Sequence, residues 1–419
     1  MEYLILLFLG IVFISSLFES KTKIPYTVYL IIIGLILSLL IYAKPFNYTS
    51  LDIKNLQFDP KLIMDFVIPP LIFEAMMQVD YYREFKPIRI TVISLSTVGV
   101  VITTLVIGII LTYFVHLSFS QSIIFAALIS STDAAIVIQT FKKIKVPKLL
   151  ARILEMESSF NDATSIIILS TVTALFIGTN SAFVLDQSDH NYEIINWNSV
   201  FEGIEHFLFV LFGGIFVGLL VAIAGNRLHA LMNDPFSETA LTITVVFGSV
   251  ILANSLGVSG LVAVATAGLF FGNITMKKES TISKDVRNTV SHFWQIAAFF
   301  ANSVIFLYLG ITMNVINIIQ NIGIIILGFV IVLFARAVAV YPILLVVNKF
   351  TKEKIPKVWR NIIVIGGMRG ALSVALVTSL PEGEIKNKLE VLIFGVVLIS
   401  LIIQYILLTK YVYKKSILF

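Results

Sequence analysis

The sequence predicts an all-α, multi-pass membrane protein with about thirteen transmembrane helices, which include two inverted repeats with one broken helix each. Three observations predict this fold class. The composition is too apolar and too poor in charge for a soluble domain. Apolar runs of transmembrane length follow one another along the whole chain. Two of these runs are interrupted by small polar residues or by glycines, at matching places in two halves of the chain.

The composition indicates that much of the protein surface faces lipid. Of the 419 residues, 58% are hydrophobic and 13% are charged, and the mean hydropathy is +0.96. A soluble domain is about half apolar and about one quarter charged. The chain contains no Cys, which excludes disulfides and thiolate metal sites, and its five His have no ligand-like spacing. We therefore expect neither a structural metal nor a cofactor.

A membrane-spanning helix needs about 20 mostly apolar residues. Runs of this kind predict spans at roughly 2–18, 25–43, 61–79, 88–115, 121–141, 149–178, 201–225, 237–256, 258–273, 289–311, 320–347, 358–380 and 389–411. The ninth span is short, whereas the fourth, sixth and eleventh are long enough to cross the bilayer at a tilt. We read the whole chain, 1–419, as a single transmembrane domain.

The Lys and Arg residues alternate between loops as they do in membrane proteins. Loops after odd-numbered spans, together with the C-terminus, hold 23 of the 30 basic residues, and loops after even-numbered spans hold 5. Because cytoplasmic loops are enriched in Lys and Arg, we predict a cell-membrane protein with its N-terminus outside and its C-terminus in the cytoplasm. The loop 179–200 carries no Lys or Arg, as an external loop should. The net charge of +5 thus reflects topology in a lipid bilayer, and no nucleic-acid partner is expected.

Six charged residues lie within the predicted spans, too far from either membrane surface to reach water. They are Glu74, Asp133, Glu157, Asp162, Arg336 and Arg369. A charge at the bilayer centre costs at least about 2.5–3.5 kcal/mol on insertion scales, so each of these residues is a functional candidate. Four of the six are acidic, and this excess indicates a pathway for cations or protons.

The span 149–178 presents a carboxylate among hydroxyl groups. Ser158, Asp162 and Ser165 are spaced by four and three residues, so they share one helix face. Hydroxyl and carboxylate oxygens are hard ligands that suit Na⁺ or Li⁺. We expect Asp162 to bind either one cation or one proton, because competition for one carboxylate is sufficient for coupled exchange.

The adjacent face of the same span holds a second carboxylate. Glu157 and Asn161 are four residues apart and lie on this face. Arg336, in the middle of the span 320–347, needs a carboxylate partner in the membrane interior. Glu157 is the preferred partner and Glu74 is the alternative. Such a buried pair would hold the shape of the site, and breaking it would be costly.

Two spans are interrupted where a continuous helix is unfavourable. The span 121–141 contains Ser130-Ser131-Thr132-Asp133, and small polar residues compete with the helix backbone for hydrogen bonds. The span 358–380 contains Gly366-Gly367-Met368-Arg369-Gly370, in which three glycines surround an arginine. An unwound segment frees backbone carbonyls and amides, and it leaves two half-helix ends near the bilayer midplane.

The interruptions suggest roles for two buried charges and a repeat organisation. Asp133 either neutralises a half-helix N-terminus or contacts an ion directly, and Arg369 compensates half-helix C-termini. The two interrupted spans run in opposite directions at matching places in residues 88–178 and 320–411. We therefore expect these two ranges to be inverted repeats that form a transport core, with a site at the midplane.

Five segments, in order along the chain, resemble those of the cation:proton antiporter-1 family, the NhaP/NHE type of sodium/proton exchangers. They are Pro69-Pro70-Leu71-Ile72-Phe73-Glu74, Thr132-Asp133, Glu157-Ser158-x-x-Asn161-Asp162, Ala335-Arg336-Ala337-Val338 and Gly366-Gly367-Met368-Arg369-Gly370-Ala371. The match covers nearly the whole chain. The sequence departs from the family pattern at Ala134, where many relatives have a proline after Thr-Asp.

The resemblance implies an NhaA-like antiporter fold, with a mobile core of two inverted repeats and a dimer domain formed by the remaining helices. It also implies a homodimer. A further implication is a Na⁺ site at Asp162, Asp133, Ser158 and Thr132, with Glu74 nearby. Asn161 would help to position this site, and Glu157 would pair with Arg336. In the family, adjacent Asn and Asp residues go with electroneutral, one-for-one exchange.

The sequence leaves other functions open. K⁺ could replace Na⁺, because sequence does not fix the size of a cavity. A cation channel would also use buried acidic residues, although paired interruptions favour alternating access. An intramembrane serine protease could use Gly257-Val258-Ser259-Gly260, but only His292 follows as a base. An aspartyl protease would need Asp133 to face Asp162, and the Gly-x-Gly-Asp context of such proteases is absent.

Overall fold

The computed structural model describes residues 2–22, 25–43, 62–115, 117–143, 146–177, 197–229, 234–276, 283–313, 315–378, 380 and 383–415, and within these residues all regular secondary structure is helical. The loop predicted over 179–200 lies outside the described residues as far as 196, and so do the predicted span ends at 61 and 178.

The helices follow one another in the order in which the spans were predicted. Those labelled η are π-helical turns. Their bounds are α1 (Glu2–Thr22), α2 (Tyr26–Ala43), η2 (Ile63–Val67), α4 (Ile68–Met77), η3 (Tyr81–Phe85), α5 (Lys86–Ser96), α6 (Val98–Phe114), α7 (Phe119–Ile129), α8 (Ala135–Lys143), α9 (Lys148–Ile177), α10 (Trp197–His229), α11 (Pro235–Ser255), α12 (Gly260–Phe270), η4 (Phe271–Thr275), α13 (Lys284–Thr312), α14 (Val315–Gln320), α15 (Ile322–Phe350), α16 (Lys357–Ile365), α17 (Ala371–Thr378), α18 (Glu384–Ile399), η5 (Ser400–Gln404) and α19 (Tyr405–Lys415).

The predicted all-α, multi-pass architecture is confirmed. Within the described residues, each predicted span coincides with one helix or with consecutive helices. Six helical stretches are long and apolar enough to cross a membrane by length and composition alone: Lys86–Phe114, Phe207–His229, Pro235–Ser255, Lys284–Thr312, Ile322–Phe350 and Lys386–Lys414. Large apolar side chains such as Phe212, Phe216 and Ile251 are exposed on these helices, as expected for surfaces that face lipid.

The two predicted helix interruptions are also confirmed. Residues 130–134 separate α7 from α8, and residues 366–370 separate α16 from α17. The first break is polar and the second is rich in glycine, so neither segment has a strong intrinsic preference for helix. In a membrane interior, irregular backbone is tolerated only where protein or water satisfies its polar groups. The two breaks therefore mark the region in which to look for a site.

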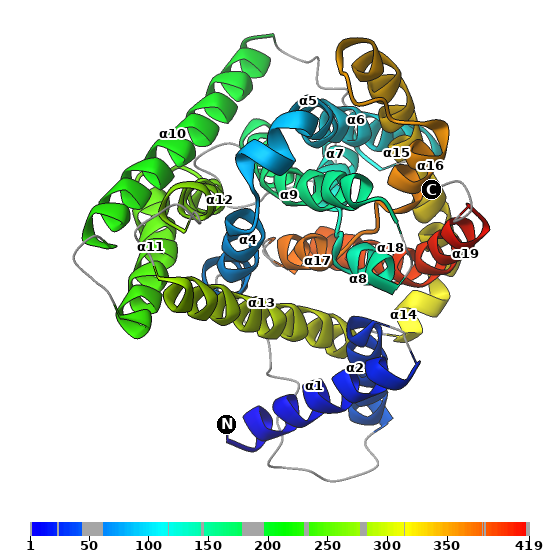
Figure 1. The fold of residues 1–419 in the computed structure, drawn as a ribbon. Helices are drawn as coiled ribbons and strands as arrows, with labels where there is room; N and C mark the ends of the chain where they lie inside the picture. Colours follow the sequence, from blue (N-terminus) through cyan, green and yellow to red (C-terminus); the bar gives the residue numbers. More distant parts are fainter. Residues whose placement is uncertain are drawn as a thin grey trace.

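The helices pack as two groups that meet along α9 and α13. In one group α4, α10, α11 and α12 pack against one another, and α13 joins them to α2. In the other group α5, α6, α7 and α9 pack with one another and with α15, α17 and α18. Figure 1 shows α10 and α11 on one side of the molecule and α15, α16 and α19 on the other, with the long α13 running from α11 to α2. Both breaks belong to the second group.

The contact between α2 and α13 depends on two small residues. Gly34 and Gly310 face each other so closely that a Cβ on Gly34 would lie 2.7 Å from the Cα atom of Gly310. Real Cβ atoms do not approach other atoms at this distance, so only glycine allows the two backbones to touch. Small residues at helix crossings are typical of membrane proteins, because close packing replaces the hydrophobic effect there.

Candidate functional site

The two helix breaks contact each other directly. The backbone amide of Asp133 donates to the carbonyl of Met368 at 2.7 Å, and the hydroxyl oxygens of Ser131 and Ser373 lie 3.4 Å apart. Each break leaves backbone groups without partners in its own helix, and an unpaired group is costly in an apolar interior. The crossing therefore satisfies some of the groups that unwinding exposes, and it joins two segments that are far apart in the sequence.

Arg369, in the second break, holds the end of the helix that precedes the first break. Its side chain is buried, and its Nη1 donates to the carbonyls of Ser130 at 2.6 Å and Ser131 at 3.0 Å. Those carbonyls follow the last residue of α7, where the helix dipole concentrates partial negative charge. The guanidinium thus sets a positive charge at the C-terminal end of this half-helix.

Two residues of α9 hold the first break in place. The Ser158 hydroxyl donates to the carbonyl of Thr132 at 2.6 Å and accepts from the amide of Ala134 at 3.2 Å. The Asn161 side-chain amide donates to the Thr132 hydroxyl at 3.1 Å. A proline at position 134 has no N–H and could not make the bond to Ser158. In this chain the departure from the family pattern therefore adds a hydrogen bond to the broken segment.

Asn161 is at the centre of a small polar cluster on the buried face of α9. Its side-chain oxygen accepts from the Ser165 hydroxyl at 3.2 Å, and the Ser165 and Ser130 hydroxyl oxygens are 3.1 Å apart. All three residues are buried. The helix spacing placed Ser165 on the face of Asp162, but it could not reveal the contact with Ser130, which lies in the first break.

Arg336 and Glu157 form a two-point ion pair between α15 and α9. Nη1 of Arg336 donates to Oε1 of Glu157 at 2.8 Å, and Nη2 donates to Oε2 at 2.9 Å. The side chains are 3% and 1% exposed, so neither charge reaches solvent. Of the two carboxylates considered for Arg336, it is Glu157 that lies opposite the guanidinium. The planar guanidinium matches both carboxylate oxygens, which makes this a strong type of hydrogen-bonded pair.

Asp162, which follows Asn161 on α9, has an unsatisfied oxygen. Its Oδ1 is buried and has no hydrogen-bond partner in the described structure. The negative charge of Asp133 lies close enough to act on the carboxylate of Asp162, whereas that of Glu157 is balanced by Arg336. A buried carboxylate oxygen without a partner is costly, and like charges nearby add to that cost. Binding a cation or a proton would relieve both penalties.

Glu74 lies in α4, outside the helices that carry the breaks. It is half-buried, and its Oε1 accepts a hydrogen bond from the side-chain amide of Gln78, one turn further along. Helix α4 packs beside α9, so Glu74 and Asp162 come from neighbouring helices. A role for Glu74 next to a bound ion stays a prediction.

Comparison with known proteins assigns the chain to a family. Residues 4–414 match the family described as sodium/hydrogen exchanger, transmembrane. The chain belongs to this family. The Na(+)/H(+) antiporter NhaH of Halobacillus aidingensis is 30% identical over 413 residues, which cover 98% of this chain and 96% of the relative. The Na(+)/H(+) antiporter ApNhaP of Aphanothece halophytica is 29% identical over 400 residues, which cover 94% of this chain and 70% of the relative.

A solved structure has a similar fold. The sodium proton antiporter MjNhaP1 from Methanocaldococcus jannaschii at pH 8 aligns with a TM-score of 0.76 and 19% sequence identity. The alignment covers 99% of this chain and 100% of that chain. At this identity the likeness concerns the fold alone, and it supports the multi-pass architecture of this sodium/hydrogen exchanger family member.

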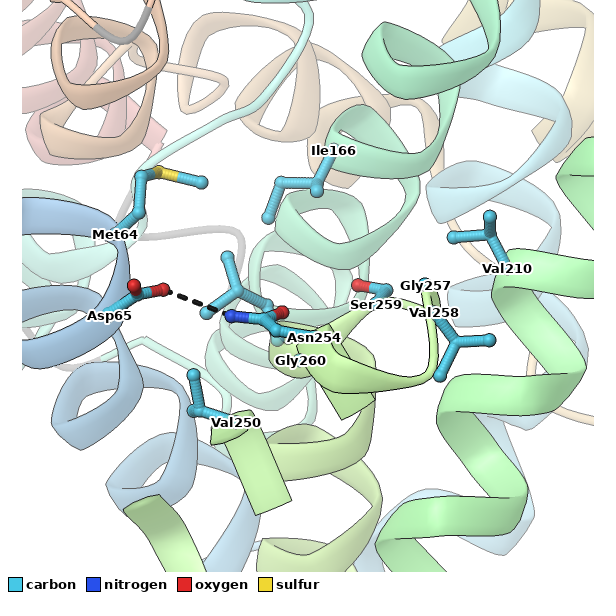
Figure 2. A pocket seen from close by; sticks show the side chains of 11 residues that line it. Met64, Asp65, Ile166, Val210, Val250, Asn254, Gly257, Val258, Ser259 and Gly260 are labelled. Carbon is cyan, nitrogen blue, oxygen red and sulfur yellow. Dashed lines mark hydrogen bonds between the residues drawn. The ribbon is translucent and has the colours of Figure 1, made fainter. Parts of the chain in front are cut away.

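Ser259, considered above as a protease nucleophile, has a structural role in this exchanger family member. It precedes α12, and its hydroxyl accepts the backbone amide of Val262 at 3.2 Å, which is a helix N-cap contact. It lines a cavity of about 300 Å³ in which Asp65 accepts a hydrogen bond from Asn254 at 3.2 Å (Figure 2). Within the described residues no hydrogen bond joins Ser259 to a histidine.

Replacing Gly370 by alanine is expected to stop transport. A Cβ at position 370 would overlap the side chain of Asp133 and lie 2.6 Å from its Cγ atom, so the carboxylate would have to move. Overpacking of this kind costs typically about 1–3 kcal/mol of folding stability. We expect Gly370→Ala to reach the membrane with lower thermal stability and with little exchange activity in reconstituted vesicles.

The matched control is Gly248→Ala in α11. A Cβ there meets no atom within 4 Å, and alanine in a helix interior is favoured over glycine by roughly 0.5–1 kcal/mol. This variant should keep wild-type activity. Full activity in Gly370→Ala would contradict the inference that the position of Asp133 matters.

Proposed function

We propose that this chain exchanges Na⁺ for H⁺ across the cell membrane, one for one, and that Li⁺ can replace Na⁺. The observation that carries the proposal is the buried, unpartnered Oδ1 of Asp162 beside two crossed helix breaks. The names of the relatives, which are Na⁺/H⁺ antiporters, support the choice of ions. No resident cofactor is part of the proposal, because the ions themselves are the substrates.

The cation is held by oxygen ligands from the first break and from α9. Asp162 and Asp133 supply carboxylates, and Thr132 and Ser158 supply hydroxyl oxygens. Hard oxygen ligands suit a small monovalent cation. The Ser158 hydroxyl already donates to Thr132 and accepts from Ala134, so one lone pair is left for an ion. Asn161 positions Thr132, and Asp162 is the ligand whose charge the ion neutralises.

A proton and a cation compete for Asp162 because each satisfies the same carboxylate. Asn161 is neutral, and the charge of Glu157 is balanced by Arg336 at 2.8 Å. The site therefore carries the same net charge whether Asp162 holds one Na⁺ or one H⁺. If the site crosses the membrane only when it is occupied, each cycle moves one positive charge in each direction. Exchange is then electroneutral and follows the two ion gradients alone.

The proposal includes alternating access, by movement of one group of helices against the other. In this proposal the inverted repeats, residues 88–178 and 320–411, carry the ion site and move against the remaining helices. Those remaining helices form the dimer interface of a homodimer, with the N-terminus outside and the C-terminus in the cytoplasm. The separate packing of the α10–α12 group and of the helices around the breaks supports such a movement.

The test is proton movement in vesicles that contain the purified protein, an imposed pH gradient and a pH-sensitive dye. Addition of Na⁺ or Li⁺ should dissipate the gradient, and the rate should be unchanged when a membrane potential is imposed. A response to K⁺ alone would keep the class and change the substrate. A rate that depends strongly on the membrane potential would contradict one-for-one exchange. If no cation moves protons through folded protein, a cation channel becomes the better interpretation.

A further inference from the structure

The last membrane span contains a polar interruption that the proposed mechanism does not use. The π-helical turn η5 separates α18 from α19, and it begins with Ser400 and ends with Gln404. Their side chains are 0% and 3% exposed. Two neutral polar residues in the interior of a membrane protein are costly unless their hydrogen-bonding groups find partners. π-helical turns inside α-helices are frequent at functional sites, so the partners of these two residues are informative.

The partners lie in the second helix break. The Ser400 hydroxyl accepts the backbone N–H of Arg369 at 2.9 Å and donates to the side-chain oxygen of Gln404. The side-chain amide of Gln404 donates to the carbonyl of Ile365 at 2.9 Å. Ile365 is the last residue of α16, where helix carbonyls lack intrahelical partners. One hydrogen-bonded chain therefore spans the break from Ile365 to Arg369.

This chain continues to the first break through the arginine. The backbone of Arg369 is held by Ser400, while its guanidinium donates to the carbonyls of Ser130 and Ser131. The neighbouring carbonyl of Met368 accepts the amide of Asp133. A shift of the segment around Arg369 would therefore move the backbone of the first break on both sides of Thr132. Thr132 and Asp133, two of the proposed ion ligands, belong to this segment.

We propose that Ser400 and Gln404 are positioning residues for the ion site. They fix the backbone of the second break, and through Arg369 and Met368 they set the position of Asp133. The inference rests on the proposed function, because it names residues that tune the same site. A positioning role differs from a purely structural role in one respect. Loss of the contact should change how the site binds Na⁺ and H⁺, beyond any change in the amount of folded protein.

The experiment compares Ser400→Ala and Gln404→Met with Thr409→Val. Thr409 lies on the same span, and its hydroxyl donates to the carbonyl of Tyr405 in its own helix, at 2.8 Å. Exchange is measured in vesicles as a function of Na⁺ concentration and pH. In Ser400→Ala and in Gln404→Met, loss of a buried hydrogen bond predicts a roughly tenfold rise in the Na⁺ concentration for half-maximal exchange. The pH at which the exchange rate is highest should also change in both variants. Thr409→Val should behave as the wild type, and Ser400→Thr, which keeps the hydroxyl, should recover most of the loss.

A second measurement follows thermal unfolding of the purified proteins with increasing Na⁺. An ion that binds only the folded state raises the melting temperature, so the half-effective concentration reports binding without transport. We expect it to rise in Ser400→Ala and Gln404→Met. Variants that lose maximal rate or thermal stability, but keep the wild-type Na⁺ dependence and pH profile, would overturn the inference. Wild-type protein that binds Na⁺ without exchanging it would contradict the proposed function. The half-effective Na⁺ concentrations of the wild type and the two variants would still test whether Ser400 and Gln404 position the ion site.

Discussion

Replacement of Asp162 by asparagine is expected to abolish Na⁺-driven proton movement, down to the level of vesicles without protein. Asparagine has nearly the same size and can fill the same space. Its side-chain amide does not exchange a proton with water near neutral pH as a carboxylate does, and it carries no charge to balance a cation. The wild-type carboxylate has a buried oxygen without a partner, so the variant should fold at least as well as the wild type. Activity should therefore be lost without loss of protein.

The measurement is the dye assay in vesicles, with Na⁺, Li⁺ and K⁺ added in turn. Glu155→Gln is the matched control on the same helix. Glu155 pairs with Arg152 at 2.6 Å, and both side chains are about one third exposed, where such a pair contributes roughly 0–1 kcal/mol. The control should retain wild-type exchange. Substantial coupled exchange by Asp162→Asn would show that another group binds the proton, and the proposed competition would be wrong.

The second large effect is expected for the buried ion pair. In Glu157→Gln the guanidinium of Arg336 keeps its charge but loses both charged hydrogen bonds, and its side chain is only 3% exposed. Breaking a buried pair by removing one partner costs about 3–5 kcal/mol, because the remaining charge is left uncompensated. We expect a large fall in melting temperature, measured as loss of monodisperse protein on heating in detergent, and a low yield of folded protein.

The double variant Glu157→Met with Arg336→Met separates charge from shape. Replacing both partners by apolar residues of similar length removes the uncompensated charge, and such replacements are often neutral or stabilising. We expect thermal stability close to that of the wild type. If the single variant Glu157→Gln is as stable as the wild type, the pair is not the structural element that its geometry indicates. Exchange by the stable double variant would show that the pair supports folding and that the ion site does not need it.

The spans and their interruptions could be predicted because each depends on a local property of the chain. About 20 apolar residues are needed to cross the hydrocarbon core, whatever the neighbours are. Small polar residues at 130–133 and glycines at 366–370 weaken helix within their own segments. The structure has breaks at 130–134 and 366–370, so the local preferences were not overridden by packing.

The candidate site could be predicted only in part. Helix spacing placed Ser158 and Asp162 on one face. It could not show that Ser158 bonds Thr132 and Ala134 within the first break, or that Oδ1 of Asp162 is left without a partner. Ser400 and Gln404 were visible as two polar residues four apart in an apolar span. They carry no charge, so burying them in a membrane costs less than burying an ionised group, and the sequence alone does not mark them as functional. Gly370 was identified as a helix breaker, although its closeness to Asp133 is what makes it irreplaceable.

By itself the sequence determined which segments cross the membrane, where two of them unwind, and which charges lie too deep to reach water. Only the tertiary structure decided which of these groups meet: the amide of Asp133 with the carbonyl of Met368, and Arg336 with Glu157. The physical reason is the range of the forces involved. Transfer into lipid and helix propensity act on each segment alone, whereas a hydrogen bond requires two groups within about 3 Å. That distance is set by the packing of segments that lie far apart along the chain.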